Sequence, residues 1–528
     1  MMNFSRRFRL SACFLLAAMI TAVCSSSYVT PVSFAETEQA ATQESVSATE
    51  AGSTTIARLL ATATSNNSAT STPPAQSSSS AQGIPYLYTA QSGDTLAAVA
   101  ARFGVAPEEI ASPQDIPDGL IAAGQIFTIP NVLGISIPSE RILPDSEVID
   151  SPSAAGFSAG SYAGPFAGHL TKYREYLPSG WHDGPAVVER VAMEQSINPR
   201  LLLSVLQYQS NWVLGDPVGT NAVDYPIGYV HPQQRGLYHQ LAWAARQLSI
   251  GYYGWRDGSL TELTFRDGVS QRIPPDLNAG TVAIQFLFAQ LYDNESWLGA
   301  MDTNAGFPFT HSEAMFPDPW GRAEQIEPLF PTALEQPHLS LPFYNTQIWY
   351  FTSGPHGAWD REGAMAALDF APSSSLPGCV PSGATITAAA SGLVVRSDNG
   401  IVVVDLDNDG REQTGWVILY LHVTNNDDLR VGDWVDRGDP LGNPSCEGGL
   451  ATASHLHIAR KYNGEWIAAS GPLPFNMSGW VSQNDGALTW PLAKPPYLGS
   501  LARDGVSITA CVCSNVFAQI AFSSNDPY

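Results

Sequence analysis

The amino-acid sequence predicts a multidomain protein with a small βααβ module, a mostly α-helical middle domain and an antiparallel β C-terminal domain. The chain has 528 residues, which is enough for about three domains. Apolar residues recur at helical spacing within residues 166–345, whereas short β-type runs separated by glycines follow from residue 346 onward. Two segments of low complexity separate these parts.

The overall composition excludes one broad class of partner. The chain carries 49 acidic and 25 basic residues, a formal net charge of −24, and no basic stripe follows the first ten residues. Because phosphate binding needs clustered Lys and Arg, we expect no nucleic-acid partner. The 45 glycines and 39 prolines predict many turns.

Residues 1–35 are expected to be a secretory signal peptide. A basic stretch opens them, with Arg6, Arg7 and Arg9. The apolar run Leu10–Val23 follows, and it is too short to span a bilayer comfortably. Cleavage after Ala35 and processing near Cys24, which would alternatively carry a lipid, both remain open. We therefore expect a secreted or cell-envelope protein with no stable membrane span after cleavage.

The two low-complexity segments are expected to be linkers. Residues 36–84 are dominated by Ser, Thr, Ala, Gln and Glu without a hydrophobic period, which predicts disorder. Residues 131–165 are rich in Pro, Ser, Gly and Ala, which predicts a second linker.

The cysteines favour disulfide bonding, since an even number remains in an exported chain after removal of the signal peptide. The four are Cys379, Cys446, Cys511 and Cys513. We prefer a Cys379–Cys446 bridge. Cys511 and Cys513 stay unassigned, because a disulfide between two cysteines so close in the sequence would be strained. Residues 501–528 are expected to be a tail that carries this pair.

Residues 86–130 have the pattern of a small βααβ module. The run Ser92-Gly93-Asp94-Thr95-Leu96 offers a helix cap before apolar residues at helical spacing, and Gly124–Pro130 closes with a strand. The segment resembles the LysM module, which binds glycans containing N-acetylglucosamine. The resemblance places sugar between the first strand–helix loop and the loop before the last strand. The matching positions are Gly93, Asp94, Thr95 and Ile121.

Residues 166–345 are expected to be mostly helical. Asn198-Pro199 is a cap followed by a first-turn proline, and Leu201, Leu202, Val205 and Leu206 come next. The run from Ser196 to Ser210 is similar to the entry helix of lysozyme-like transglycosylases. Their general-acid glutamate is replaced here by Gln209, whose amide cannot protonate a leaving oxygen. A degenerate glycan-gripping relative, an unrelated helical scaffold and an active glycosidase all remain open.

Residues 346–500 combine short strands with an unusual set of histidines. In Ser454-His455-Leu456-His457 the two imidazoles share one face of a strand, because side chains alternate with period two. Upstream lie His356, Asp369 and His422, each in a glycine-rich or strand context. Three ligands from His and carboxylate, with water as the fourth, are typical of catalytic Zn²⁺.

This region resembles the lysostaphin-type zinc endopeptidases, which cut peptide bonds of peptidoglycan. The resemblance rests on the histidine motifs and on the ordered run Val431-Gly432-Asp433 to Leu441-Gly442. It implies that His356, Asp369 and His457 bind zinc and that His422 and His455 act on the water and the oxyanion. Asp360 stands at the family's usual offset from His356, but Asp369 has the strand context, so we prefer Asp369 and expect an inserted loop.

The resemblances together predict an exported, monomeric cell-wall hydrolase. We expect a LysM module to hold the chain on peptidoglycan glycan, and a zinc metalloendopeptidase to cleave the stem peptides. The alternative is a non-hydrolytic peptidoglycan-binding regulator of other hydrolases. Cleavage of glycan strands by the middle domain is disfavoured by Gln209.

Overall fold

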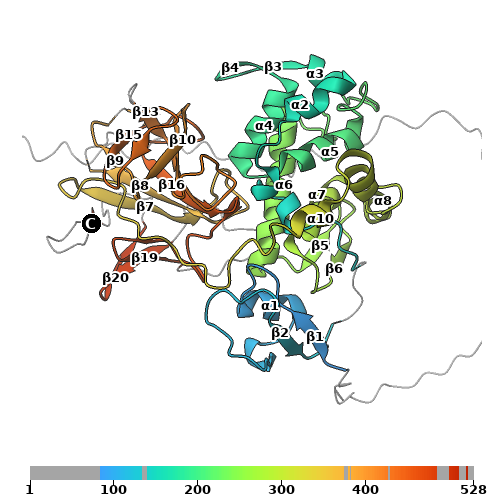
Figure 1. Cartoon of the computed structure of the whole chain (residues 1–528), viewed down its shortest axis with the longest axis horizontal. Helices are drawn as coiled ribbons and strands as arrows, with labels where there is room; N and C mark the ends of the chain where they lie inside the picture. The colour runs from blue at the N-terminus through green and yellow to red at the C-terminus, as the bar shows by residue number, and fades with distance from the viewer. Residues whose placement is uncertain are drawn as a thin grey trace, which may run out of the picture. The chain divides into compact units, whose positions relative to one another are not determined.

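The structure is a computed structural model, and it describes residues 84–133, 139–373, 378–380, 382–425, 429–484, 499–510 and 519–520. The predicted signal peptide and nearly all of the first predicted linker lie outside these residues. We refer to residues 84–133 as the N-terminal module, to 139–334 as the helical domain and to 339–510 as the β domain (Figure 1). The predicted fold class, a small βα module, a helical domain and an antiparallel β domain, is confirmed.

The N-terminal module pairs β1 (Tyr86–Thr89) with β2 (Ile126–Ile129) around α1 (Leu96–Phe103) and a 3₁₀ turn at Pro107–Glu109. Thr95 is the N-cap of α1 and accepts a hydrogen bond from the Ala98 amide. Asp94 is fully buried and makes an ion pair of 2.8 Å with Arg102. A buried charge needs such a partner, so the pair fixes the loop before α1.

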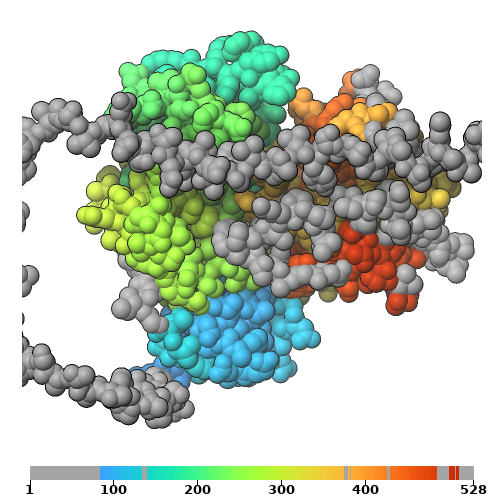
Figure 2. All heavy atoms as spheres, turned by 180° about the vertical axis from the view of Figure 1, so that it is seen from behind, coloured from blue at the N-terminus to red at the C-terminus, as the bar shows by residue number. Residues whose placement is uncertain are grey.

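The N-terminal module contacts the helical domain through buried and half-buried side chains. Arg102 Nε donates to the Trp255 carbonyl at 3.2 Å, and Arg272 Nη2 donates to the Ala101 carbonyl at 2.8 Å. In the space-filling view the blue spheres of the module meet the green and yellow spheres of the helical domain (Figure 2).

The helical domain is built around α6 (Leu237–Asp257) and α7 (Ala279–Leu291), which lie side by side in Figure 1. A Cβ at Gly251 of α6 would lie 2.8 Å from the Ala283 Cα, so a glycine is needed for this close approach. Asn198 caps α5 as expected, accepting from the Arg200 amide. The other helices are α2 (Ala159–Ala163), α3 (His169–Lys172), α4 (Gly184–Gln195), α5 (Pro199–Ser210), α8 (Asn294–Ala300), α9 (Phe307–Phe309) and α10 (Pro319–Ala323).

Two short hairpins complete the helical domain. The strands are β3 (Arg174–Leu177), β4 (Gly180–Asp183), β5 (Glu262–Thr264) and β6 (Ser270–Arg272). Within the described ranges, no helix has the length and apolar composition that crossing a bilayer requires.

The prediction that residues 131–165 form a linker is wrong for most of the segment. Leu143, Val148 and Ile149 are fully buried in the core of the helical domain. The Pro- and Ser-rich composition builds short 3₁₀ turns at Asp145–Glu147 and Pro152–Ala154. Their backbone is fixed by tertiary contacts, for example Asn278 Nδ2 donating to the Leu143 carbonyl at 2.7 Å. Composition alone does not reveal such contacts.

The β domain contains one large antiparallel sheet. Its strand order is β14-β10-β11-β12-β16-β8-β7-β22, with β17 paired to β16. The bounds are β7 (Trp349–His356), β8 (Ala367–Pro372), β10 (Gly392–Asp398), β11 (Ile401–Asp405), β12 (Trp416–Leu421), β14 (Trp434–Val435), β16 (Leu456–Tyr462), β17 (Glu465–Trp466) and β22 (Gln519–Ile520). Leu339, Leu341 and Phe343 already belong to this core, so the β domain begins before the expected residue 346.

Two smaller sheets flank the large one. The first is β13-β15-β9, with β9 (Ile386–Thr387), β13 (Val423–Asn425) and β15 (Pro440–Pro444). The second is β18-β19-β20-β21, with β18 (Asn476–Met477), β19 (Trp480–Gln483), β20 (Ser500–Arg503) and β21 (Val506–Thr509). Residues 500–509 therefore form a hairpin of this sheet rather than the start of a tail, because β20 pairs with β19.

The expected disulfide joins Cys379 to Cys446, whose Cα atoms are 5.5 Å apart. Cys511 and Cys513 lie outside the described residues. Next to the bridge, Ser454 Oγ donates to the Val380 carbonyl at 2.6 Å. The disulfide and this hydrogen bond together hold residues 378–380 beside the segment that leads into His455.

A buried charge cluster connects the three parts. Arg256 of α6 lies 3.0 Å from both Asp145 and Glu465, and it also donates to the Ser92 carbonyl of the N-terminal module. Burial would lower the pKa of the guanidinium, but Glu465, Tyr252 and Asp145 together outweigh burial and raise that pKa. The arginine therefore stays charged and bonds to all three parts.

The first prediction concerns Glu147, a fully buried carboxylate paired with Arg322 at 2.9 Å. Burial would raise its pKa, but the nearby His311 and the hydrogen bonds and charge of Arg322 lower the pKa to about 2, against 4.5 ordinarily. The lowered pKa stabilises the folded state by roughly 3 kcal/mol. This contribution is fully present above about pH 4.5 and is lost as the pH falls through about 2. We expect Arg322→Met to lower the free energy of unfolding by about 3 kcal/mol at neutral pH.

Denaturant unfolding followed by far-UV circular dichroism measures this effect, and the difference from the natural chain should shrink near pH 3. The matched control is Arg235→Met, which breaks an exposed ion pair with Asp224 and should change stability by less than about 1 kcal/mol. Equal stability of the Arg322 and Arg235 variants would contradict the assignment.

Candidate metal centre of the β domain

The register of the large sheet brings the expected metal ligands together. On adjacent antiparallel strands, Asp369 of β8 lies directly opposite His457 of β16, so their side chains share one face. His356 ends β7, where two register shifts turn the strand toward the same place. These irregularities allow a residue on a third strand to join a cross-strand pair.

The three side chains make a compact cluster. His356 Nε2 lies 3.0 Å from His457 Nδ1 and 3.1 Å from Asp369 Oδ1, and His457 Nδ1 lies 3.2 Å from the same oxygen. Among the described residues, this trio is one of two groups whose ligand atoms lie close enough to hold a metal ion. The sequence-predicted trio is therefore a candidate metal site.

Backbone carbonyls fix the tautomers of both ligand histidines. His356 Nδ1 donates to the Gly354 carbonyl at 2.9 Å, and His457 Nε2 donates to the Ala358 carbonyl at 2.8 Å. Each ring therefore carries its lone pair on the other nitrogen, and these two nitrogens face one another. The acceptors Gly354 and Ala358 act through their backbones, so no side-chain signal in the sequence could have revealed them.

The donor set fits a zinc ion. Two imidazole nitrogens and one carboxylate oxygen match the ligands of catalytic zinc sites. Facing lone pairs repel unless a cation lies between them. Asp369 Oδ1 is buried and accepts no well-formed hydrogen bond from a described residue, although both imidazole nitrogens are close. These features are expected of residues arranged around a metal ion rather than around one another.

The electrostatics of the trio favour positive charge. Burial would raise the pKa of the Asp369 carboxyl, but His356 and His455 outweigh it and hold that pKa well below its usual range. Burial would lower the pKa of His356, but the Asp369 charge raises it above the ordinary value. The pKa of His457 is lowered, chiefly by burial. Asp369 thus stays ionised at neutral pH and His457 stays neutral.

The two remaining histidines lie beside the trio. The rings of His422 and His455 have centroids 4.5 Å apart, and His455 Nε2 lies 3.6 Å from Asp369 Oδ2. His422 follows β12 with a left-handed φ of +64°, which directs the chain from the large sheet into β13. Ser445 secures this turn, since its amide and its hydroxyl both donate to the His422 carbonyl.

Backbone carbonyls also fix these two rings. His422 Nδ1 donates to the Glu447 carbonyl at 2.7 Å, and His455 Nδ1 donates to the Ala453 carbonyl at 2.8 Å. Burial, followed by the neighbouring His455 and His457, lowers the pKa of His422 to about 3. His422 is therefore neutral at physiological pH and presents a free Nε2 lone pair.

Asp360, the alternative ligand, lies elsewhere. Its carboxylate is 3.4 Å from Arg246 of α6, and it is not part of the trio. Asp360 belongs to the loop that follows His356, whereas Asp369 lies within the sheet. The geometry favours the sequence-based preference for Asp369.

The structure also brings together the four expected glycan-binding positions. The Ile121 amide donates to the Asp94 carbonyl at 2.8 Å, and Thr95 and Gly93 adjoin them. The side chains of Asp94 and Ile121 are buried, so their roles in the module are structural. Gly93 has a φ of +82°, and a Cβ there would lie 2.8 Å from Arg256 Nη1.

Gln209, at the position of the absent general acid, lies on α5. Its Oε1 accepts a hydrogen bond from the Tyr292 hydroxyl at 2.9 Å. No proton donor of the carboxylic-acid type replaces it at this position.

Three family models match the chain, one in each part. Residues 378–469 match Peptidase family M23, residues 88–130 match the LysM domain, and residues 141–328 match the LasA, N-terminal domain. The β domain is therefore an M23, lysostaphin-like peptidase domain, and the N-terminal module is a LysM domain. M23 peptidases are zinc-dependent, and His356, Asp369 and His457 form the candidate site.

The matches refine two expectations. The helical segment that resembles lysozyme-like transglycosylases matches a LasA N-terminal domain, which extends over most of the wrongly predicted linker. The M23 match contains His422, His455 and His457, but it begins after His356 and Asp369.

Solved structures of M23 peptidases are similar to the β domain. Pseudoalterin, an M23 metalloprotease from the deep sea, is 20% identical with a TM-score of 0.27, over 33% of this chain and 96% of that one. The catalytic domain of lysostaphin from Staphylococcus simulans is 22% identical with a TM-score of 0.17, over 24% and 88%. A zinc-containing peptidase from Vibrio cholerae is 18% identical with a TM-score of 0.19, over 26% and 41%. A search of curated proteins found no match.

The site makes a prediction that separates the two aspartates. We expect Asp369→Asn to weaken zinc binding by at least about 100-fold, since loss of outer-sphere partners alone costs 10- to 100-fold. Asp360→Asn should bind zinc like the natural chain. Competition with a chromophoric chelator measures both affinities. Loss of zinc in the Asp360 variant alone would contradict the assignment.

Proposed function

We propose that the protein is an exported zinc endopeptidase that cleaves peptide bonds of peptidoglycan. The observation that carries the proposal is the cluster of His356, Asp369 and His457, with His422 and His455 beside it. The M23 match supports the reaction class, and the LysM match supports peptidoglycan as the substrate. The LysM match and the disulfide support a location outside the cytoplasm.

His356, Asp369 and His457 would hold the zinc ion, which when bound supplies a Lewis acid that activates water and polarises a carbonyl. His422 and His455 then handle protons through their free Nε2 atoms. Either ring, in its neutral form, can accept a proton from the attacking water as the oxygen adds to the carbonyl carbon. The protonated ring stabilises the developing oxyanion, or donates its proton to the nitrogen as the C–N bond breaks and the amine leaves.

The LysM domain would keep the enzyme on its insoluble substrate. Gly93 and Thr95 are half-buried and are the positions of the expected glycan loop whose atoms remain partly accessible. Asp94 and Ile121 would support that loop from within. A tether raises the local concentration of cleavable peptides without a new contact at the catalytic site.

A non-hydrolytic regulator is the alternative function. Such a protein would need the fold but not the ligands. The described residues retain all five expected side chains, and backbone carbonyls fix the tautomers of the four histidines, which favours the hydrolase.

The proposal predicts that the natural chain carries about one zinc ion and releases new amino groups from purified peptidoglycan. His457→Ala should lose both zinc and amine release. His422→Ala should keep zinc but lose amine release by about 10²- to 10⁴-fold, because it removes only a proton acceptor. Zinc content by mass spectrometry and amine labelling measure the two properties.

The matched control is His231→Ala, an exposed histidine that accepts a hydrogen bond from the Gln233 amide. It should behave like the natural chain in both assays. A natural chain that neither binds zinc nor releases amines would leave the regulator as the function.

A further inference from the structure

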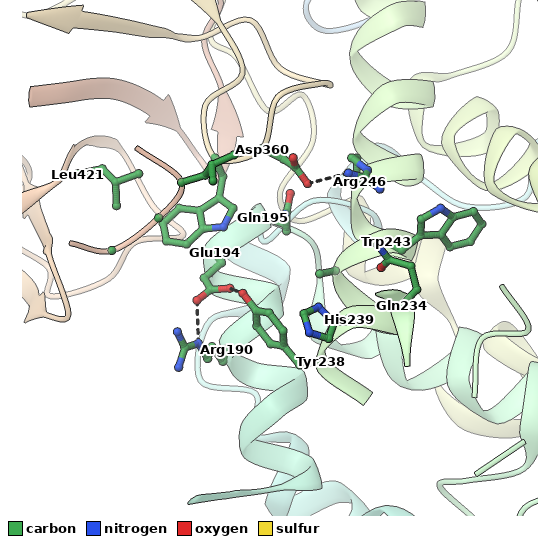
Figure 3. A pocket seen from close by; sticks show the side chains of 15 residues that line it. Arg190, Glu194, Gln195, Gln234, Tyr238, His239, Trp243, Arg246, Asp360 and Leu421 are labelled. Carbon is green, nitrogen blue, oxygen red and sulfur yellow. Dashed lines mark hydrogen bonds and ion pairs between the residues drawn. The ribbon is translucent and has the colours of Figure 1, made fainter. Parts of the chain in front are cut away.

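A pocket of about 280 Å³ lies between the helical domain and the β domain (Figure 3). One wall comes from α4 and α6, and the other comes from the loop after β7, the end of β12 and the segment Gly448–Leu450. In Figure 3, Asp360 and Leu421 lie on the β-domain side, and Tyr238, His239 and Trp243 lie on the α6 side.

The β-domain wall is continuous with the candidate metal centre. Trp359 and Asp360 follow the Ala358 carbonyl that holds His457, and Leu421 directly precedes His422. A Cβ at Gly449 would lie 3.4 Å from the His422 ring. A peptide that crosses the metal centre would therefore meet this pocket within a few residues of the reacting bond.

Most charges in the pocket are already satisfied within the helical domain. Arg190 Nε donates to Glu194 Oε1 at 2.7 Å, and Tyr238 donates to Glu194 Oε2 at 2.8 Å. Arg190 also donates to the Ser179 hydroxyl. These groups form a closed network at one side of the pocket.

Arg246 has spare hydrogen-bonding capacity. Its guanidinium has five N–H donors, and its ion pair with Asp360 is a single contact of 3.4 Å. Its Nε is buried without a hydrogen-bond partner among the described residues. A guanidinium with unused parallel donors is suited to bind a carboxylate with two hydrogen bonds.

A second polar group also lines the pocket. Gln195 is 7% exposed, and its side chain points into the pocket (Figure 3). Its side-chain amide can both donate and accept hydrogen bonds, so it is suited to a ligand that offers peptide N–H and C=O groups. The aromatic ring of Trp359 gives the same pocket an apolar surface.

We propose that this pocket is a substrate subsite shared by the two domains, and that Arg246 selects peptides bearing a carboxylate near the scissile bond. The inference rests on the proposed function, and it assigns part of the specificity to the helical domain. The incoming carboxylate would compete with Asp360 for Arg246, and Gln195 would bond to the peptide backbone. Arg246 is a specificity residue and touches no reacting atom.

Soluble peptides from a peptidoglycan digest test the proposal when each is compared with its carboxamide, made by carbodiimide coupling to ammonia. We expect the natural chain to prefer the carboxylate form by about tenfold in KM, with kcat little changed. Arg246→Gln should lose this preference, and Arg246→Lys should keep part of it because it retains the charge. Arg235→Gln, which removes an exposed arginine outside the pocket, should keep all of it.

The same preference in the natural chain and in Arg246→Gln would overturn the proposal, as would no preference in the natural chain. If neither the natural chain nor any variant cleaves a peptide, the proposed endopeptidase function fails. Peptide-binding measurements then decide whether the subsite exists. Intrinsic fluorescence reports binding, since Trp243 and Trp359 line the pocket. Carboxylate-selective binding that is lost in Arg246→Gln would sustain the subsite, and unselective or absent binding would overturn it.

Discussion

The repulsion between two imidazole lone pairs is the constraint on which the site depends. His356 Nε2 and His457 Nδ1 face each other at 3.0 Å because each ring donates its other nitrogen to a backbone carbonyl. A metal ion between these nitrogens, or a proton on His356, makes the arrangement favourable, and Asp369 supplies the balancing negative charge. The sheet register and the irregularities of β7 serve this arrangement, since they bring three strands to one point.

The surroundings of the site extend beyond the β domain. The same loop that presents Ala358 to His457 continues to Asp360, which pairs with Arg246 of α6. Further along α6, Arg256 bonds to Glu465 of the β domain and to Ser92 of the LysM domain. A buried arginine with several partners opposes separation of these three domains, because each broken contact would leave a charge unpaired. The helical domain is thus positioned to shape what reaches the metal centre.

The sequence predicted the features that depend on local periodicity. Alternation on a strand placed His455 and His457 on one face, and the strand context of Asp369 favoured it over Asp360. The LysM and M23 resemblances, the fold class and the Cys379–Cys446 bridge were also predictable, because they rest on motifs or on counting. The burial of residues 139–165 was not, since Pro- and Ser-rich turns become ordered only through distant partners such as Asn278. Tautomers fixed by backbone carbonyls and the role of Arg246 depend on tertiary contacts that leave no sequence pattern.

X-ray absorption at the zinc edge of the natural chain identifies the atoms bound to the metal. We expect a first shell of two imidazole nitrogens at roughly 2.0–2.1 Å, completed by oxygen from Asp369 and water, with no sulfur. Removal of His457 should leave one imidazole in any zinc that remains. A shell containing sulfur, or one with no imidazole, would contradict the account, because the facing lone pairs of His356 and His457 would then have another explanation.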